Sequence, residues 1–274
     1  MHTNNPILIV SDGGSTGGDR RAGLFSYVLQ VISNLHVAEE CGMDLYVKFT
    51  NNPYTEEKGS NTWDYYFTQP FGITESQVSQ YIGYLKDDWF FGNLKCGNPI
   101  LTKEVITRTQ ELVSKYIFPK PHILSKKDRF ISDYIQTDNY ASIHFRGTDH
   151  IIDAPTLNKQ IYVDNIQNIF NSYEKILVCS DEQPFVDEVK MLFGANKIVS
   201  YPSIRSTSKI PIHHNNIGQK YQTGEDVLIE SLLMSQSKYL IRTVSNVTHF
   251  AIFNNKHLQY KHIDDLNLYT KFIC

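Results

Sequence analysis

The segment Ile143–His150, with the sequence IHFRGTDH, brings four chemically active side chains to the end of an apolar run. It supplies two imidazoles, one guanidinium and one carboxylate. Side chains two residues apart on a strand lie on the same side, so His144 and Arg146 are expected to face one ligand together. Arginine offers a rigid fork of donors that fits a phosphate or a carboxylate. An ion pair between Arg146 and Asp149 that closes a turn is the alternative interpretation of this spacing.

A second candidate group lies on a helix predicted over residues 226–236, for which Thr223 to Asp226 offers a start signal. Asp226 and Glu230 are four residues apart, so both carboxylates fall on one helical face. Such a pair can accept hydrogen bonds from the N–H groups of a base, or it can hold an arginine. A solvated helix face is the alternative.

Three further segments have features that suit an anion. Residues 242–249 turn from a strand into a helix, and the N–H groups at a helix start bind anions. The loop Gly13–Gly23 allows close approach of a phosphate, although its spacing fits neither common phosphate-binding motif. Asp181 ends another predicted strand, where helix capping is the alternative role. His213 and His214 point apart on an extended chain, so we predict no metal site.

The elements that position these residues follow an α/β pattern. A strand over 7–10, a helix from Ala22 to about Gly42 and a strand over 45–49 form a βαβ unit. Residues 54–96 are rich in aromatic side chains and poor in periodicity, which indicates an insertion that packs a small core or acts as a lid. Strands and helices then alternate from residue 141 to residue 253, which is typical of a parallel sheet wound on both faces.

Composition excludes several classes of protein. The 274 residues carry 26 Lys and Arg against 29 Asp and Glu, so no basic footprint for nucleic acid is present. No apolar run reaches the roughly 18 residues that cross a bilayer, and the first residues lack a secretory signal. Four cysteines without a CxxC pair fit a reducing compartment. We therefore expect a cytoplasmic protein with no nucleic-acid partner and no transmembrane segment.

The segments His144–His150 and Gly224–Asn254 together resemble the GDP-fucose-using fucosyltransferases, a group that includes core α1,6, nodulation, α1,2 and protein O-fucosyltransferases. These enzymes share a strand end of the H-x-R-x-x-D type, followed much later by an acidic helix, a strand and a serine-containing turn. The resemblance implies a GT-B-like α/β fold with two facing Rossmann-like domains and parallel sheets. The implied boundaries are an N-terminal, acceptor-side domain over 1–125 with the insertion at about 54–96, a nucleotide-sugar-binding domain over 138–255, and a tail over 256–274.

The implied activity is an inverting, metal-independent transfer of fucose from GDP-fucose to a glycan or oligosaccharide acceptor, with no cofactor besides the donor substrate. Arg146 would hold the β-phosphate, while His144, Glu230 and Asp226 would contact the guanosine. The residues implied in donor binding come from both halves: Gly17, Gly18, Arg20, Ala22, Gly23, His144, Arg146, Asp181, Asp226, Glu230, Ser245, Asn246 and Val247.

The chain departs from the family pattern at two points. The core α1,6 enzymes have a second arginine and a lysine where this chain has Gly147 and His150. Their glutamate base would fall near Ala154, so Asp153 and His150 become the candidates for the base. The predicted catalytic residues are therefore Arg146, Asp149, Asp153 and His150. Transfer from another nucleotide sugar such as GDP-mannose, or a non-catalytic nucleotide- or sugar-binding module, are the alternative functions.

Overall fold

The computed structural model of the chain describes residues 5–12, 22–78, 84–86, 101–148, 158–208, 210–212 and 218–264. Several predicted site residues lie outside these ranges: Gly17, Gly18, Arg20, Asp149, His150 and Asp153. The paired histidines His213 and His214 also lie outside them. The site is therefore described from the remaining residues.

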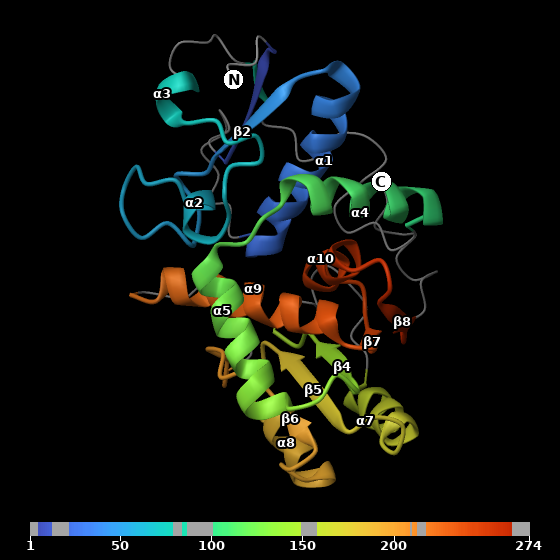
Figure 1. Cartoon of the computed structure of the whole chain (residues 1–274). Coiled ribbons are helices and arrows are strands. Elements are labelled where there is room, and N and C mark those ends of the chain that lie inside the picture. Colours follow the sequence, from blue (N-terminus) through green and yellow to red (C-terminus); the bar gives the residue numbers. More distant parts are fainter. Residues whose placement is uncertain are drawn as a thin grey trace.

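The elements follow one another in α/β order (Figure 1). The first half contains β1 (Ile7–Ser11), α1 (Leu24–Cys41), β2 (Asp44–Lys48), α2 (Trp63–Tyr66), α3 (Glu75–Val78), β3 (Tyr84–Lys86), α4 (Lys103–Tyr116), α5 (Pro121–Phe130) and the π-helix η1 (Ile131–Ile135). The second half contains β4 (Tyr140–Phe145), α7 (Lys159–Ile169), β5 (Lys175–Ser180), α8 (Gln183–Phe193), β6 (Ile198–Val199), α9 (Lys220–Gln236), β7 (Tyr239–Arg242), α10 (Asn246–Asn254) and β8 (Gln259–His262).

The first half is built around the predicted βαβ unit. Strands β2, β1 and β3 form a parallel sheet in that order, with Ile7 opposite Asp44 in the register. Helix α1 packs along this sheet because its apolar side chains recur at helical spacing. It ends at Gly42, which adopts the left-handed conformation with φ 62° that glycine tolerates best. The apolar spacing and the glycine stop thus predicted this unit.

The second half is a five-stranded parallel sheet in the order β6-β5-β4-β7-β8, with His144 opposite Cys179 in the register. Helices α7 and α8 pack on one face through Phe145, Tyr162 and Phe185. Helices α9 and α10 lie on the other face, between the two sheets (Figure 1). Because side chains alternate along a strand, Ile143 and Phe145 face α7 and α8 while His144 faces α9. The doubly wound sheet is as predicted.

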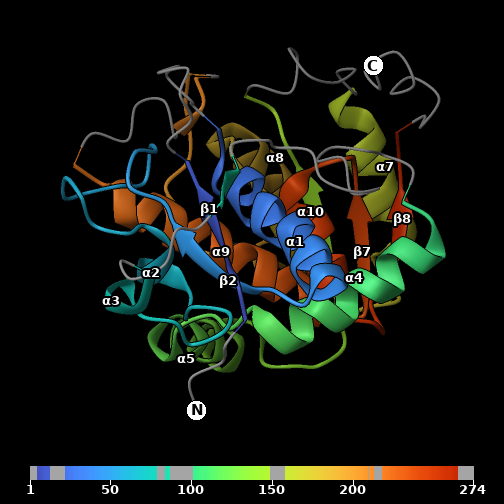
Figure 2. The same ribbon diagram turned by 90° about the horizontal axis from the view of Figure 1, so that it is seen from above.

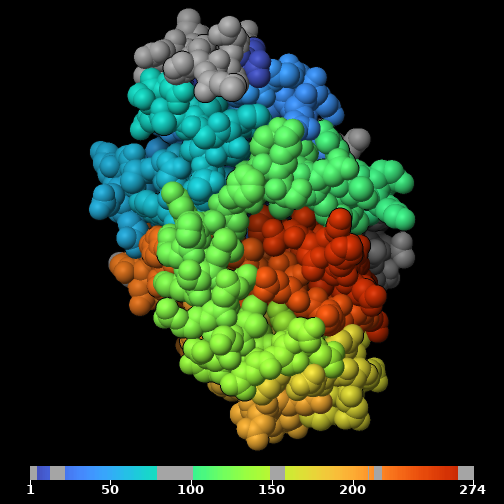
Figure 3. Space-filling view, in the orientation of Figure 1, coloured from blue at the N-terminus to red at the C-terminus, as the bar shows by residue number. Residues whose placement is uncertain are grey.

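The two halves share one hydrophobic core. Side chains of α1, α4 and the first sheet belong to the same buried cluster as side chains of α9 and α10. Phe25 of α1 contacts Phe250 of α10 with ring centroids 5.1 Å apart. Figure 2 shows α1 lying over α10 and α9, and Figure 3 shows α4 and α5 running across the junction of the halves on one face of the molecule. The halves are therefore joined by packing as well as by the chain.

Aromatic side chains from the first part of the aromatic-rich insertion belong to this core. Tyr54, Trp63, Tyr66 and Phe67 are buried, and Trp63 stacks on Phe67 with a centroid distance of 4.4 Å. Tyr66 stacks on Tyr221 of α9, at 5.5 Å between ring centroids, and its hydroxyl donates to the Tyr221 carbonyl. These aromatic side chains thus connect the first half to a helix of the second.

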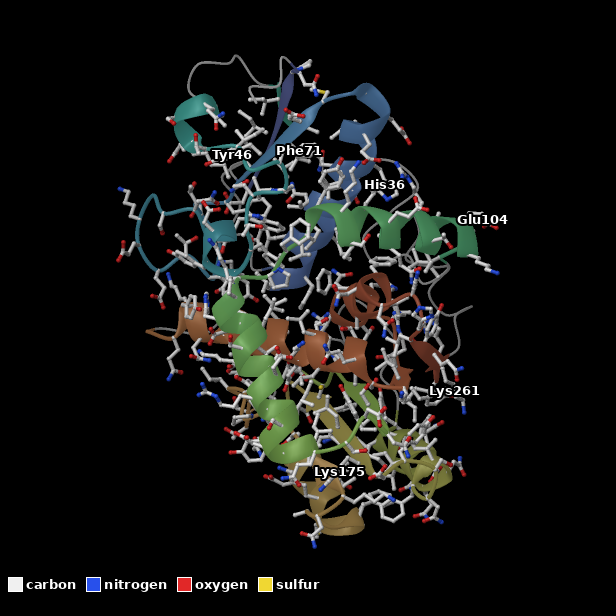
Figure 4. The ribbon with its side chains drawn as sticks, viewed as in Figure 1. His36, Tyr46, Phe71, Glu104, Lys175 and Lys261 are labelled. Carbon is white, nitrogen blue, oxygen red and sulfur yellow. The ribbon has the colours of Figure 1, made fainter. Side chains whose placement is uncertain are left out.

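Two element boundaries differ from the sequence-based expectations. Helix α9 begins at Lys220, so Thr223 and Gly224 lie inside it and do not start it. Strand β8 pairs in parallel with β7, within the range expected to form a C-terminal tail. In the side-chain view (Figure 4), Lys261 on β8 lies at one edge of this sheet, where its ammonium group donates to Asn165 of α7 at 2.9 Å. Among the described residues, no helix is both long and apolar enough to cross a bilayer.

Candidate active site between the two sheets

The end of β4 is tied to the end of β5 by the carboxylate of Asp181. The Gly147 amide donates to Oδ1 at 2.8 Å, and the Thr148 hydroxyl donates to Oδ2 at 2.5 Å. Burial raises the pKa of Asp181, against the lowering effect of these hydrogen bonds and of the Arg146 charge. Asp181 therefore fixes the backbone that follows Arg146 rather than capping α8.

Gly147 has a packing reason to be glycine. A Cβ atom added there would overlap the carboxyl group of Glu182 and would lie 2.7 Å from the Phe145 ring. Glu182 is itself buried and accepts a hydrogen bond from the Lys159 ammonium group at 2.9 Å. The Glu182 side chain thus occupies the space that a larger residue at position 147 would need. At this same position the core α1,6 pattern has an arginine in place of glycine.

Asp226 and Glu230 lie on a buried face of α9 and are only 4% and 6% exposed, so the solvated-face alternative is wrong. The Ile204 amide donates to Asp226 Oδ2 at 2.9 Å. Two donors from the same loop reach Glu230 Oε1, the Ser203 hydroxyl at 2.7 Å and Arg205 Nη2 at 2.7 Å. The acidic pair therefore anchors the loop that follows β6.

Burial dominates the protonation of both carboxylates. It raises the pKa of Asp226, against the hydrogen bonds from Ile204 and Gln222. It raises the pKa of Glu230 to about 7, against the lowering effect of the Arg205 charge and the Ser203 hydroxyl. Glu230 can therefore change its charge near neutral pH.

Two helix N-termini meet opposite the end of β4. The first turn of α1 contacts the first turn of α10, where Asn246 Nδ2 donates to Ser26 Oγ at 3.1 Å. The Leu24 amide, one of the first in α1, donates to the Tyr54 hydroxyl at 2.9 Å. Among the described residues, no partner is found for the buried Oγ of Ser245, which precedes α10. Helix N-termini carry partial positive charge, so this junction favours an anion.

Most of the groups described above line one cleft between the halves. The first half contributes Gly23, Leu24, Phe25, Ser26 and Tyr54. The second contributes His144, Arg146, Thr148, Ser180, Asp181, Ser203, Ile204, Ile212, Thr223, Asp226, Val227, Glu230, Asn246 and Val247. A guanidinium and two helix starts thus share the cleft with a buried acidic pair.

The structure brings together most of the predicted site residues that it describes. Ala22 precedes the cleft, and Ser245 lies next to it in the chain, directly before Asn246. Sequence reasoning missed Ser203, Arg205 and Tyr54. Arg205 follows the predicted strand 197–200, so the rule that selected Asp181 could also have selected Arg205. Tyr54 was predicted only as one member of the aromatic-rich insertion, because its contact with α1 spans 30 residues of chain.

The described residues do not test the prediction that the chain binds no metal. Within the described part of the chain, no group of three or more His, Cys, Asp or Glu side chains is arranged to hold an ion. The other segments of the chain also contain acidic residues and histidines, and this observation does not cover them.

Comparison with known proteins places this cleft in a known fold. A scan against protein-family models and a search of curated proteins find no match. Solved structures do match. NodZ fucosyltransferase from Bradyrhizobium has a TM-score of 0.58 at 16% identity, over 91% of this chain and 92% of that chain. A variant of Arabidopsis thaliana FUT1 in complex with GDP has a TM-score of 0.57 at 12% identity, over 96% of this chain and 71% of that one. POFUT1 in complex with GDP-fucose has a TM-score of 0.54 at 11% identity, over 94% and 98%.

The chain has the fold of these fucosyltransferases. The predicted α/β, GT-B-like architecture with parallel sheets is confirmed, and the resemblance read from the two sequence blocks is confirmed at the level of the fold. NodZ has also been crystallised with GDP, with a TM-score of 0.59 to this chain.

Proposed function

We propose that the chain is a glycosyltransferase that moves fucose from GDP-fucose to a glycan or oligosaccharide acceptor, with inversion and without a metal. The observation that carries this proposal is the cleft itself, in which Arg146 and two helix N-termini lie in one space with Asp226 and Glu230. A nucleoside diphosphate matches these groups. Its diphosphate is an anion that suits Arg146 and the helix N-termini, and its base can carry N–H groups that donate to Asp226 and Glu230. Proteins of the same fold are seen with GDP or GDP-fucose bound.

In this proposal the reaction is a single displacement at the anomeric carbon of fucose. The acceptor hydroxyl attacks that carbon from the side opposite GDP, the bond to the β-phosphate oxygen breaks, and GDP leaves. Arg146 and the starts of α1 and α10 stabilise the negative charge that develops on the leaving group. Asp153 and His150 remain the candidates for the base that takes the acceptor proton, and Asp149 belongs to the same proposal as a further catalytic residue.

The domains divide this work. We propose that residues 138–255 bind the nucleotide sugar and that residues 1–125 lie on the acceptor side. Gly23 to Ser26 line the cleft from the first half, which supports contact of both domains with the donor. Gly17, Gly18, Arg20 and Ala22 belong to the same proposal as residues that close over the diphosphate.

Turnover of the donor tests the proposal. We expect the chain to release GDP from GDP-fucose, slowly to water and faster with an acceptor glycan, equally well in EDTA. The anomeric configuration of the product, read by NMR, is expected to be opposite to that of the donor. If the chain binds GDP but never cleaves GDP-fucose, it is a binding module and the proposed transfer is wrong. Faster turnover of GDP-mannose would assign the other donor.

A further inference from the structure

Arg205 is a buried guanidinium that is not placed to bind phosphate. Its side chain is 4% exposed, and its donors are directed at protein oxygens. Nε donates to the Ser180 carbonyl at 3.0 Å, Nη1 to the Ser203 carbonyl at 3.2 Å, and Nη2 to the Tyr201 carbonyl at 2.6 Å and to Glu230 Oε1 at 2.7 Å. It therefore joins the end of β5, the loop after β6 and helix α9 at one point.

These contacts involve only one of the two carboxylate oxygens of Glu230. Oε1 accepts from both Arg205 and Ser203, while Glu230 itself lines the cleft. Neither of these bonds uses Oε2. A carboxylate held through one oxygen has a fixed plane, so the direction in which the other oxygen can accept is also fixed.

We propose that Arg205, assisted by Ser203, is a positioning residue that fixes Glu230 as a reader of the base, selective for a purine with an N–H donor at ring position 1. This inference rests on the proposed function, because it assumes that a nucleoside diphosphate occupies the cleft. Guanine presents N1–H and an amino group along one edge, whereas adenine has an acceptor at N1 that faces a carboxylate unfavourably. A carboxylate free to rotate or to take up a proton would lose this discrimination.

The charges around Glu230 agree with this role. Arg205 and Tyr201 face it from the loop after β6, Cys179 from β5 and Asp226 from α9, while His144 and Arg146 line the same cleft. Burial and the neighbouring Asp226 charge favour the neutral acid and raise the pKa of Glu230. The Arg205 charge favours the carboxylate and offsets part of this rise. Arg205 thus favours the ionised form of Glu230, which accepts hydrogen bonds, where burial alone would favour a protonated carboxyl group.

Binding measured by calorimetry at pH 8 on the full chain tests this role, with GDP, ADP and inorganic pyrophosphate as probes. For Arg205→Met we expect the affinity for GDP to fall about 10- to 100-fold, the range for losing a charge-assisted hydrogen bond. The affinities for ADP and pyrophosphate should change by less than about 3-fold, because the phosphates bind elsewhere in the cleft. Arg129→Met, at an exposed arginine of α5, is the matched control and should leave all three unchanged.

A double-mutant cycle separates positioning from general loss of structure. Arg205→Met combined with Glu230→Gln should bind GDP no more weakly than Glu230→Gln alone, since Arg205 acts through Glu230. Additive losses, or a GDP-to-ADP ratio in Arg205→Met equal to that of the wild type, would overturn the inference.

Two milder variants cover the case in which Arg205→Met does not fold, which loss of pyrophosphate binding would reveal. Ser203→Ala removes one of the two donors to Oε1, and Arg205→Lys keeps the charge but not the fork. Each should lower the GDP-to-ADP ratio by about 3- to 10-fold, and an unchanged ratio in both refutes the inference. A wild-type chain that does not prefer GDP to ADP would instead contradict the proposed function.

Discussion

Glu230 is a buried carboxyl group that lines the cleft. Its pKa is raised by burial from 4.5 to about 7, so in the free protein the neutral acid predominates below that pH. Folding favours the neutral form, so the stability that this group contributes is present below about pH 4.5 and is lost as the pH rises through about 7. A base that donates N–H groups needs the opposite form, the carboxylate.

The affinity for GDP should therefore increase as the pH rises towards about 7 and level off above it. Below the pKa of Glu230 the increase should be up to about 10-fold per pH unit. Calorimetric titration of GDP from pH 5.5 to pH 8.5 measures this. The terminal phosphate of GDP also titrates near pH 6, so the control is Glu230→Gln, which retains the phosphate step and lacks the step at about 7. Identical pH profiles for the two proteins would rule out Glu230 as the titrating group.

Single residues also show where sequence reasoning stops. His144, Arg146, Asp226 and Glu230 were found because their spacing alone places them on a strand end or on one helical face. Arg205 was missed because its role depends on the Ser180 carbonyl of β5 and on a carboxylate 25 residues away in the chain. Local spacing carries no information on such contacts.

Helix α9 connects the cleft to the first half of the molecule. Gly224 faces Tyr66, whose hydroxyl lies where a Cβ atom would be, and Tyr54 Cδ1 lies 3.0 Å from that position. Four residues earlier in the helix, the Lys220 ammonium group donates to the Thr55 carbonyl at 3.0 Å. The start of α9 is therefore set by contacts with residues 54–66, which explains why local capping signals placed it too late.

Gly224→Ala should destabilise the fold by about 1–3 kcal/mol, because overlap with Tyr66 outweighs the roughly 1 kcal/mol that alanine gains over glycine in a helix. Urea denaturation measures the change. The cost should be smaller in a Tyr66→Phe background, where the overlapping hydroxyl is absent.

Gly23→Ala is the matched control for that substitution. No atom of the described residues would lie within 4 Å of its Cβ, and its φ of −67° suits any residue, so stability should change by less than about 0.5 kcal/mol. A stabilising effect of Gly224→Ala, or an equal cost with and without the Tyr66 hydroxyl, would show that the packing of α9 on residues 54–66 is looser than described.

In the described part of the chain, two parallel sheets are joined by one core that α1, α4, α9 and α10 share. Alternating strands and helices predicted both sheets, because each βα unit is specified by its own apolar pattern. The union of the halves could not be predicted in this way. Phe25 and Phe250 are separated by most of the chain, and residues 54–67 show no clear periodicity because their aromatic side chains pack partly on α9.

A shared core should make the halves unfold together. Both tryptophans, Trp63 and Trp89, lie in the first half, so tryptophan fluorescence reports that half while far-UV circular dichroism reports the whole chain. The two thermal transitions are expected to coincide within about 1 °C, as in two-state unfolding. A fluorescence transition that clearly precedes or follows the loss of helix would show that the halves are independent units.

We claim that the cleft binds a guanosine diphosphate through Arg146. The direct test is thermal unfolding of the wild type, Arg146→Ala and the control Arg129→Ala with GDP at about 100 times its dissociation constant. We expect GDP to stabilise the wild type and the control by about 2.7 kcal/mol, a shift of several degrees, and Arg146→Ala by less than about 0.5 kcal/mol at the same concentration. Stabilisation of Arg146→Ala equal to that of the wild type, or none in any of the three proteins, would contradict the claim.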